Sequence, residues 1–274
     1  MLQTCKLCRV CLVLPDNVIY NEREIITCEV HTMNFTDFTY DEAHNLKIRL
    51  RMPEGVENPP LFIYIHGGGI ENGNYMGNQA SMEMLTSDGI ATAAIGYRLY
   101  PNAKYPEFIE DCAAAVAFMK NLPGYSFKDI YVGGSSAGSY LSMMLFFDPK
   151  YLGAHGIDPL DLAGYVFDAG QPTVHFNVLR ERGMDTRLLR VDEAAPIYHI
   201  TKNYDTSRNL PKIVHIAASQ DIKCRLQQVQ LLQETMRHFG YPDDKNKFYY
   251  MNGYTHCKYS NTRAFVDLVE TIAK

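Results

Sequence analysis

Runs of apolar residues alternate with amphipathic stretches along most of the chain, and the two patterns predict strands and helices in turn. Residues 46–51 alternate apolar and basic side chains with a period of two, which predicts a strand with one solvated face. Residues 61–65 form a continuous apolar run, as in a strand covered on both faces. Strands are also expected at 18–20, 25–30, 90–97, 128–132, 162–167, 212–217 and 247–251. Helices are expected at 78–87, 106–122, 139–147, 222–239 and 260–273.

This order of elements predicts an α/β fold with a mostly parallel central sheet and helices on both faces. A chain of 274 residues is long enough for one large domain, and no shift in composition marks a second. We expect residues 1–45 to form an N-terminal arm with strands. Residues 168–209 show mixed periodicity, and we expect them to form a short insert after the sixth strand that acts as a lid or lines the substrate cleft.

Charge and cysteine content narrow the class of protein. The net charge of −5 at pH 7 gives no reason to expect a nucleic acid or an anionic membrane as partner. No apolar run reaches the roughly 18 residues of a spanning helix, and the N-terminus lacks the pattern of a signal peptide. The seven cysteines are odd in number, and most are scattered among expected core elements. We therefore expect reduced thiols and a cytoplasmic protein.

Three cysteines near the N-terminus, Cys5, Cys8 and Cys11, have the spacing C-x2-C-x2-C. A zinc site needs four ligands, and the ferredoxin-type run continues to a fourth cysteine followed by proline. Cys28 or His31 would have to complete such a site. We expect free thiols instead, and neither a metal nor an organic cofactor.

The segment 133–138 reads GGSSAG and joins an expected strand to an expected helix. Its G-x-S-x-G spacing centres on Ser136, with Gly134 two residues before and Gly138 two residues after. A serine at such a turn has a strained backbone and an exposed hydroxyl, and glycine on either side avoids a clash. Ser135 is out of register. A Gly/Ser turn without catalytic function has the same letters, so the rest of the chain must decide.

A serine nucleophile needs a histidine base and a carboxylate that orients the base. His256 lies in the loop after the last expected strand, and Asp221 follows the strand at 212–217. The order Ser…Asp…His is the one expected for a nucleophile on a strand–turn–helix. As an alternative, Asp221 is the N-cap of the next helix. Asp243 and Asp244 are rival carboxylates in a segment that resembles a solvated turn.

Residues 66–69 read HGGG and follow the buried run at 61–65. A glycine-rich loop at this place allows the backbone to approach a substrate carbonyl closely. The backbone N–H groups of Gly68 and Gly69, together with that of Ala137 at the start of the next helix, are therefore expected to form an oxyanion hole. A phosphate-binding loop is disfavoured, because neither G-x-G-x-x-G nor G-K-[ST] is present.

Together these motifs resemble the α/β-hydrolase superfamily, and within it the hormone-sensitive-lipase-like and carbohydrate-esterase-like branch of small serine esterases, which includes acetyl and feruloyl esterases. The resemblance covers about residues 45–270. It rests on HGGG, on GYRLYP at 96–101 with Asp111 after it, on GGSSAG, and on Asp221 and His256. It implies attack by Ser136 on an ester and proton transfer by His256. It also implies a structural ion pair between Arg98 and Asp111.

The chain departs from this family in two places. Ile70 follows the glycines, where many relatives carry an aromatic residue, and the N-terminal arm is too short for a full helical cap. These departures favour a more open cleft, in which the insert at 168–209 is the cover in place of a helical cap. Gln171, Phe176 and Tyr198 are the expected substrate contacts.

We therefore expect hydrolysis of short-chain or aromatic esters of the acetyl or feruloyl type, including carbohydrate-linked ones. An amidase such as an arylformamidase has the same machinery and stays open as an alternative. So does a hydrolase fold kept only for binding. The expected partner is a small-molecule ester, and a homodimer is left open.

Overall fold

The computed structural model describes residues 18–21, 24–27 and 35–274, and the chain divides into two compact units, Met1–Asn34 and Phe35–Lys274. In the first unit, β1 (Val18–Asn21) and β2 (Glu24–Thr27) form an antiparallel pair, where two strands were predicted. The cysteine cluster and its two candidate additional ligands lie outside the described residues. The free thiols expected there stay a prediction.

The second unit contains a sheet of eight strands with helices between them. The strands are β3 (Phe35–Asp41), β4 (Leu46–Arg51), β5 (Leu61–Ile65), β6 (Ala91–Ile95), β7 (Ile130–Ser135), β8 (Gly164–Asp168), β9 (Lys212–Gln220) and β10 (Asn246–Thr255). The helices are α1 (Gln79–Ser87), α2 (Glu107–Lys120), α3 (Ala137–Phe147), α4 (Lys150–Gly153), α5 (Phe176–Glu181), α6 (Arg225–His238) and α7 (Arg263–Ala273). Short 3₁₀ helices span Pro159–Asp161 and Pro196–His199.

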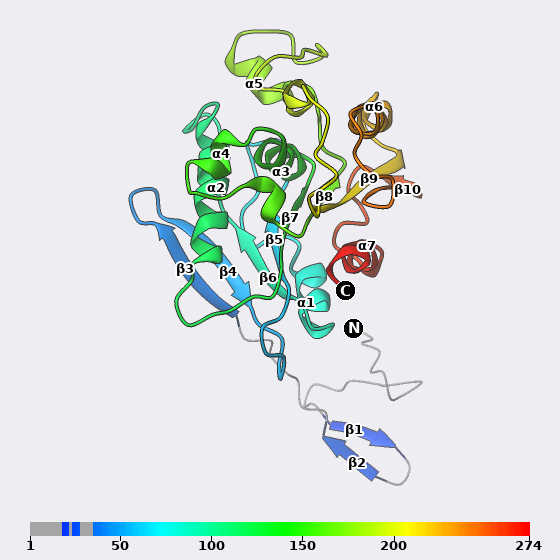
Figure 1. The fold of residues 1–274 in the computed structure, drawn as a ribbon. Coiled ribbons are helices and arrows are strands. Elements are labelled where there is room, and N and C mark those ends of the chain that lie inside the picture. Colours follow the sequence, from blue (N-terminus) through cyan, green and yellow to red (C-terminus); the bar gives the residue numbers. More distant parts are fainter. Residues whose placement is uncertain (1–17, 22–23, 28–34) are drawn as a thin grey trace. The chain divides into compact units, whose positions relative to one another are not determined.

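The strands lie in the order β10-β9-β8-β7-β5-β6-β4-β3 (Figure 1). Strands β10 to β6 in this order are parallel, whereas β4 and β3 run antiparallel to their neighbours. The predicted mostly parallel sheet is confirmed. Strand β3 was not predicted: it lies at an edge of the sheet, its first residues are exposed, and its sequence lacks a continuous apolar run.

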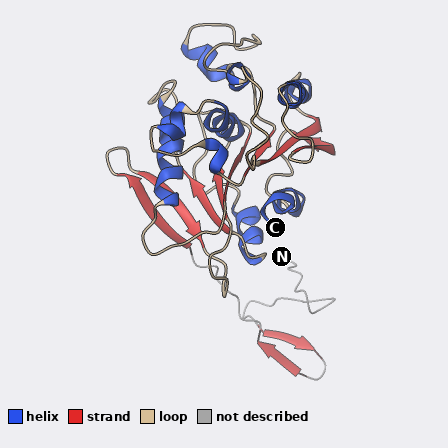
Figure 2. Cartoon of the chain, in the orientation of Figure 1, coloured by secondary structure: helices blue, strands red, loops and turns tan. Residues whose placement is uncertain are grey.

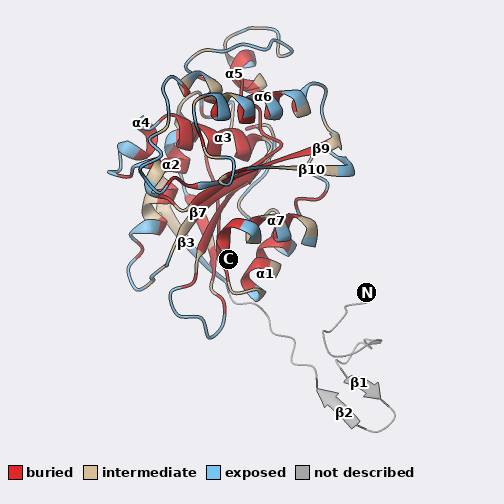
Figure 3. Cartoon of the chain, turned by 45° about the vertical axis from the view of Figure 1, so that its right-hand side comes forward, coloured by how far each residue is buried: buried red, intermediate tan, exposed pale blue. Residues whose placement is uncertain are grey.

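Helices cover both faces of the sheet (Figure 2). Strand β5 shows why a continuous apolar run was needed there. Leu61, Ile63 and Ile65 belong to the core shared with α2, α3 and α6, whereas Phe62 and Tyr64 belong to the core shared with α1 and α7. The buried residues follow the sheet and the inward faces of these helices (Figure 3).

The ion pair implied between Arg98 and Asp111 is present and anchors the segment after β6 to α2. Arg98 Nη2 lies 2.8 Å from Asp111 Oδ1, and the Arg98 backbone N–H donates to the same carboxylate at 2.9 Å. The hydrogen bonds and charge of Asp111 raise the pKa of the arginine above its usual range. Because these bonds hold a loop in place, the pair is structural.

Parallel strands bring the loops that follow them to one edge of the sheet. The C-terminal ends of β5, β7 and β8 lie in register, and β9 extends beyond them: Ile65 pairs with Gly134, and Asp168 pairs with both Ser135 and Ile216. The loops carrying the predicted site residues follow β5, β7, β9 and β10, and the insert follows β8. No helix in the described part of the chain is long and apolar enough to cross a membrane.

Candidate active site

Ser136 occupies the sharp turn between β7 and α3. Its backbone angles are φ 57° and ψ −114°, which lie outside the regions that non-glycine residues favour. The turn is held by a hydrogen bond from the Ser136 N–H to the Asp168 carbonyl at 2.8 Å. Gly138 is required two residues later, because a Cβ there would overlap the carbonyl group of Ile65. The sequence thus builds a turn that raises one serine above the end of the sheet.

The structure brings Ser136, His256 and Asp221 into one chain of hydrogen bonds. Ser136 Oγ lies 2.8 Å from His256 Nε2, and His256 Nδ1 lies 2.5 Å from Asp221 Oδ1. A carboxylate accepts the hydrogen on Nδ1, which leaves the lone pair of Nε2 facing the serine hydroxyl. This arrangement suits proton transfer from the serine to the histidine. We call these three side chains the triad.

The surroundings of Asp221 keep it ionised. Its side chain is 2% exposed, and it also accepts hydrogen bonds from the backbone N–H groups of Ile222 (2.7 Å) and Ala218 (3.3 Å). Burial raises the pKa of this carboxyl, but the hydrogen bond and charge of His256 and the two N–H groups outweigh it and hold the pKa below its usual range. At neutral pH Asp221 therefore carries a full negative charge beside the imidazole.

The alternative reading of Asp221 as a helix cap does not fit the structure. Helix α6 begins at Arg225 after Cys224, and no side chain of the described residues caps it. The rival carboxylate Asp243 pairs with Arg237 and is largely exposed. Of the candidate carboxylates, Asp221 is therefore the one that contacts His256.

The HGGG loop and the start of α3 supply three free donors. Gly68 and Gly69 have φ of 115° and 67°, which glycine adopts without strain. Ala137 is the first residue of α3. Within residues 35–274, no acceptor pairs with the backbone N–H of Gly68, Gly69 or Ala137. These are the three groups predicted for the oxyanion hole.

Hydrogen bonds to two carbonyl groups fix the direction of the loop N–H groups. The Gly67 carbonyl accepts from His66 Nδ1 at 2.7 Å, and the Gly68 carbonyl accepts from the N–H groups of Glu71 (3.1 Å) and Asn72 (2.9 Å). In a trans peptide the C=O and the following N–H point in opposite directions, so the next two N–H groups point away from these bonds. Burial lowers the pKa of His66 to about 4, which keeps the imidazole neutral.

The insert contacts this loop through α5. A Cβ added to Gly69 would lie 2.9 Å from Cζ of Phe176, so the Phe176 ring packs directly on the loop. Asn177 Nδ2 donates to the Gly69 carbonyl at 2.9 Å, and Arg180 forms an ion pair with Glu71. Asn177 was not predicted. Its partner lies 108 residues away, and no local motif marks it.

The other two predicted substrate contacts have different surroundings. Gln171 is buried, and its amide nitrogen donates to the Val174 carbonyl at 2.8 Å. Tyr198 is half exposed and lines a cavity of about 850 Å³ near the end of α3. No triad residue lines that cavity. Of the three, Phe176 contacts the oxyanion loop, and a role in substrate binding stays a prediction for all of them.

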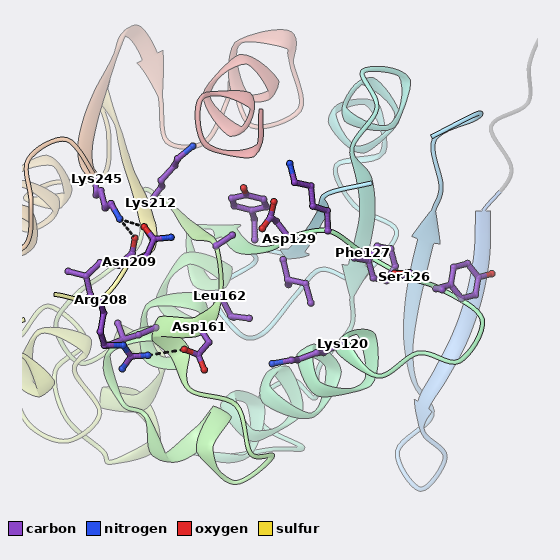
Figure 4. Close-up of a pocket in the computed structure, with 17 residues that line it drawn as sticks. Lys120, Ser126, Phe127, Asp129, Asp161, Leu162, Arg208, Asn209, Lys212 and Lys245 are labelled. Atoms are coloured by element: carbon purple, nitrogen blue, oxygen red, sulfur yellow. Dashed lines mark hydrogen bonds and ion pairs between the residues drawn. The ribbon is translucent and has the colours of Figure 1, made fainter. Parts of the chain in front are cut away.

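A second large cavity, of about 870 Å³, lies at the opposite end of the sheet (Figure 4). It is lined by the first residues of β7 and β9 and by the segments that lead into β7 and β8. Several of its cations bind protein groups: Lys245 Nζ contacts the Asn209 side chain at 2.6 Å, and Arg208 pairs with Asp158 and Asp161. Its lining residues include none of the triad, so the cavity is separate from the candidate active site.

The loop that carries His256 is tied to the start of α1. Asn78 Nδ2 donates to the carbonyl oxygen of Ser260 at 3.0 Å and contacts its hydroxyl at 3.1 Å. The Ser81 N–H donates to Asn261 Oδ1 at 3.0 Å. These bonds hold the far end of the histidine loop.

Comparison with known protein sequences shows partial matches. The BD-FAE family model matches residues 48–150. Kynurenine formamidase avaC of Aspergillus versicolor is 36% identical over 132 residues, which is 42% of this chain and 45% of that protein. The acetyl esterase of Salmonella typhi is 33% identical over 99 residues, which is 35% of this chain and 30% of that protein. The chain thus spans less than half the length of these curated relatives.

Similarity to solved structures extends over most of the chain. A thermophilic esterase from the Planctomycetes species Thermogutta terrifontis has a TM-score of 0.68 at 19% identity, covering 86% of this chain and 89% of that one. A hyperthermophilic esterase from the archaeon Pyrobaculum calidifontis has a TM-score of 0.66 at 18% identity, covering 88% and 83%. The predicted α/β-hydrolase fold is confirmed.

Proposed function

We propose that this chain, an α/β-hydrolase similar to the hormone-sensitive-lipase-like esterases, is a serine hydrolase that cleaves carboxylic esters. One observation carries the proposal: Ser136, His256 and Asp221 form a hydrogen-bonded chain. The free N–H groups of Gly68, Gly69 and Ala137 add to it, because acyl transfer needs an oxyanion hole as well as a nucleophile.

In the first half of the reaction, Ser136 Oγ bonds to the acyl carbon while His256 Nε2 takes the hydroxyl proton. Asp221 stabilises the imidazolium that forms. The carbonyl oxygen becomes an oxyanion that accepts hydrogen bonds from the loop and from the start of α3. When the intermediate collapses, the bond to the alcohol oxygen breaks, and the alcohol leaves with the proton from His256.

In the second half, water attacks the acyl-enzyme and His256 takes its proton. The acid leaves, and Ser136 recovers its proton from the imidazolium. Every group in this sequence belongs to the chain, the substrate or water. No step in this sequence requires a metal or an organic cofactor, and the absence of both stays an expectation.

The favoured substrates are esters of short-chain or aromatic acids, of the acetyl or feruloyl type. The BD-FAE match and the acetyl esterase relative support this class. The Phe176 ring on Gly69 adds a flat apolar wall beside the oxyanion loop, which suits a small or planar acyl group. We likewise propose that residues 168–209 line the substrate cleft of a single hydrolase domain.

An amidase is the second candidate function, because the relative with 36% identity is a kynurenine formamidase. A formyl group is the smallest acyl group, and its amide is cleaved by the same two half-reactions. The leaving group is then an arylamine, which takes the proton from His256 in place of an alcohol. The triad serves both reactions, so only measured activity separates them.

Hydrolysis of p-nitrophenyl esters from acetate to decanoate tests the proposal, with an N-formyl arylamine assayed in parallel. We expect the highest kcat/KM between acetate and butyrate, and loss of hydrolysis in Ser136→Ala. A kcat/KM for the formyl amide above that for every ester would favour the amidase. Hydrolysis that survives in Ser136→Ala contradicts both. Labelling by a fluorophosphonate separates a hydrolase from a binding protein, because only an activated serine reacts.

A further inference from the structure

A second chain of polar side chains lies on the core side of the nucleophile. Asp168, the last residue of β8, accepts hydrogen bonds from Ser135 Oγ and from the Tyr259 hydroxyl, each at 2.5 Å. The Tyr64 hydroxyl donates to Ser135 Oγ at 3.1 Å. All four side chains are at most 3% exposed. We call them the buried tetrad.

Each member of the buried tetrad borders one part of the candidate site. Ser135 directly precedes the nucleophile, and Tyr259 follows the base by three residues. Tyr64 lies near the end of β5, just before the HGGG loop. The backbone carbonyl of Asp168 also accepts the N–H of the nucleophile at 2.8 Å. One aspartate therefore bonds to the nucleophile turn and to the histidine loop at once.

The aspartate is a costly choice for this position. Within the described ranges, no lysine, arginine or histidine forms an ion pair with Asp168. Burial raises the pKa of its carboxyl to about 6, although the hydrogen bonds from Ser135 and Tyr259 act in the opposite direction. A buried carboxylate without a cation destabilises a fold. A neutral residue would serve packing alone at lower cost.

We propose that Asp168 is a positioning residue for the hydrolysis, which fixes the nucleophile turn against the histidine loop through Ser135 and Tyr259. This inference rests on the proposed function. Small displacements matter here, because an error of about 1 Å between reacting groups lowers a rate by about 100-fold.

The test compares Asp168→Asn and Tyr259→Phe with a matched control, Tyr165→Phe. Tyr165 is also fully buried, and its hydroxyl donates to the Pro159 carbonyl at 2.9 Å, away from the catalytic loops. For each variant we would measure kcat and KM with p-nitrophenyl acetate and the thermal unfolding midpoint. Wild type and Ser136→Ala set the baseline.

We expect Tyr259→Phe and Tyr165→Phe to lose similar stability. Only Tyr259→Phe should lose kcat, by about 10-fold to 100-fold, with KM little changed. Asp168→Asn should lose at least as much kcat, again with KM little changed. The double variant Asp168→Asn/Tyr259→Phe should lose less kcat than the product of the two single losses, because both substitutions alter the same contact between residues 168 and 259.

Two outcomes separate this inference from the proposed function. If wild-type hydrolysis is absent or survives in Ser136→Ala, the proposed function is wrong and this inference fails with it. If hydrolysis depends on Ser136 but Tyr259→Phe retains the kcat of Tyr165→Phe, only the positioning role is wrong. Tyr259→Phe decides the matter even if Asp168→Asn does not fold.

Discussion

The triad and the buried tetrad hold the same functional groups in different surroundings. Each contains a serine hydroxyl and an aspartate carboxylate, and the two serines are neighbours in sequence. In the triad an imidazole that is 23% exposed lies between the two groups. In the buried tetrad, Ser135 donates directly to Asp168, and both side chains are buried.

Under the proposed function, this contrast explains why Ser136 and not Ser135 acts as the nucleophile. A carboxylate alone accepts the hydroxyl hydrogen but does not carry the proton to a leaving group, whereas an imidazole takes it and returns it near neutral pH. The strained turn adds the second difference, because it lifts Ser136 out of the sheet while Ser135 stays within β7. Proximity to an aspartate is therefore not sufficient to make a serine a nucleophile.

The largest effect that tests this contrast comes from alanine at the two serines in turn. Ser136→Ala should lower kcat by about 10⁴-fold to 10⁶-fold, because no other group forms the acyl-enzyme. Ser135→Ala should lower kcat by about 10-fold to 100-fold through loss of positioning. Steady-state kinetics with p-nitrophenyl acetate measures both. Equal losses in the two variants would erase the distinction between the triad and the buried tetrad.

The next largest effect is expected at the aspartate of the triad. Asp221→Asn should lower kcat by about 10³-fold to 10⁴-fold, because an amide nitrogen facing Nδ1 favours the wrong imidazole tautomer. The fold should persist, since the amide still occupies the same space. Kinetics and circular dichroism measured together check this. A loss below about tenfold would mean that Asp221 does not orient the base.

A third effect concerns stability and pH, and it isolates the aspartate of the buried tetrad. The folded protein holds the proton of Asp168 up to about pH 6, because burial raises the pKa of this carboxyl from its usual value of 3.8 to about 6. Between these pH values the folded state binds more protons, so the contribution of Asp168 to the free energy of unfolding falls as pH rises. Asp168→Asn removes this fall. Relative to wild type, the variant should gain up to about 3 kcal/mol between pH 4 and pH 7.

Urea unfolding of wild type and Asp168→Asn at pH 4, 5, 6 and 7 measures this gain. Asp221 titrates in the opposite direction, because its low pKa adds stability that is lost as pH falls. It is present in both proteins and cancels in the difference. A constant difference in the free energy of unfolding across the four pH values would show that folding does not raise the pKa of Asp168.

The smallest effect is expected from the contact between the insert and the oxyanion loop. Asn177→Ala removes the hydrogen bond to the Gly69 carbonyl and should lower kcat by about tenfold, because the oxyanion loop loses one restraint. Stability should change little, since Asn177 Oδ1 is buried without a partner and is removed as well. Asn121→Ala, which removes a similar bond at the end of α2, is the matched control. Equal kcat in the two variants would argue against this restraint.

Sequence predicted the sheet and the triad because both depend on local patterns. The run at 61–65 and the spacing around Ser136 are readable within a few residues. His256 and Asp221 follow from their places after strands, since parallel strands bring such residues together. The buried tetrad was missed, although Asp168 ends an apolar run just as Asp221 follows one. Nothing local distinguishes a buried carboxylate from one beside a base.

The insert was the least predictable region, for a physical reason. Its residues pack against distant partners: Phe176 against Gly69, and Gln171 against Arg225 and Val174. Such contacts leave no periodicity in the chain. The edge strand β3 was missed for a related reason, because exposure on one side removes the apolar signal.

The ties between Asn78, Ser260 and Asn261 have a consequence for the entropy of turnover. A histidine loop that is ordered only when substrate binds must lose conformational freedom in every catalytic cycle. Here hydrogen bonds fasten the loop to α1, so that loss occurs once, during folding. Under the proposed function, the histidine therefore begins each cycle beside the serine, and none of the substrate's binding energy is needed to bring it there.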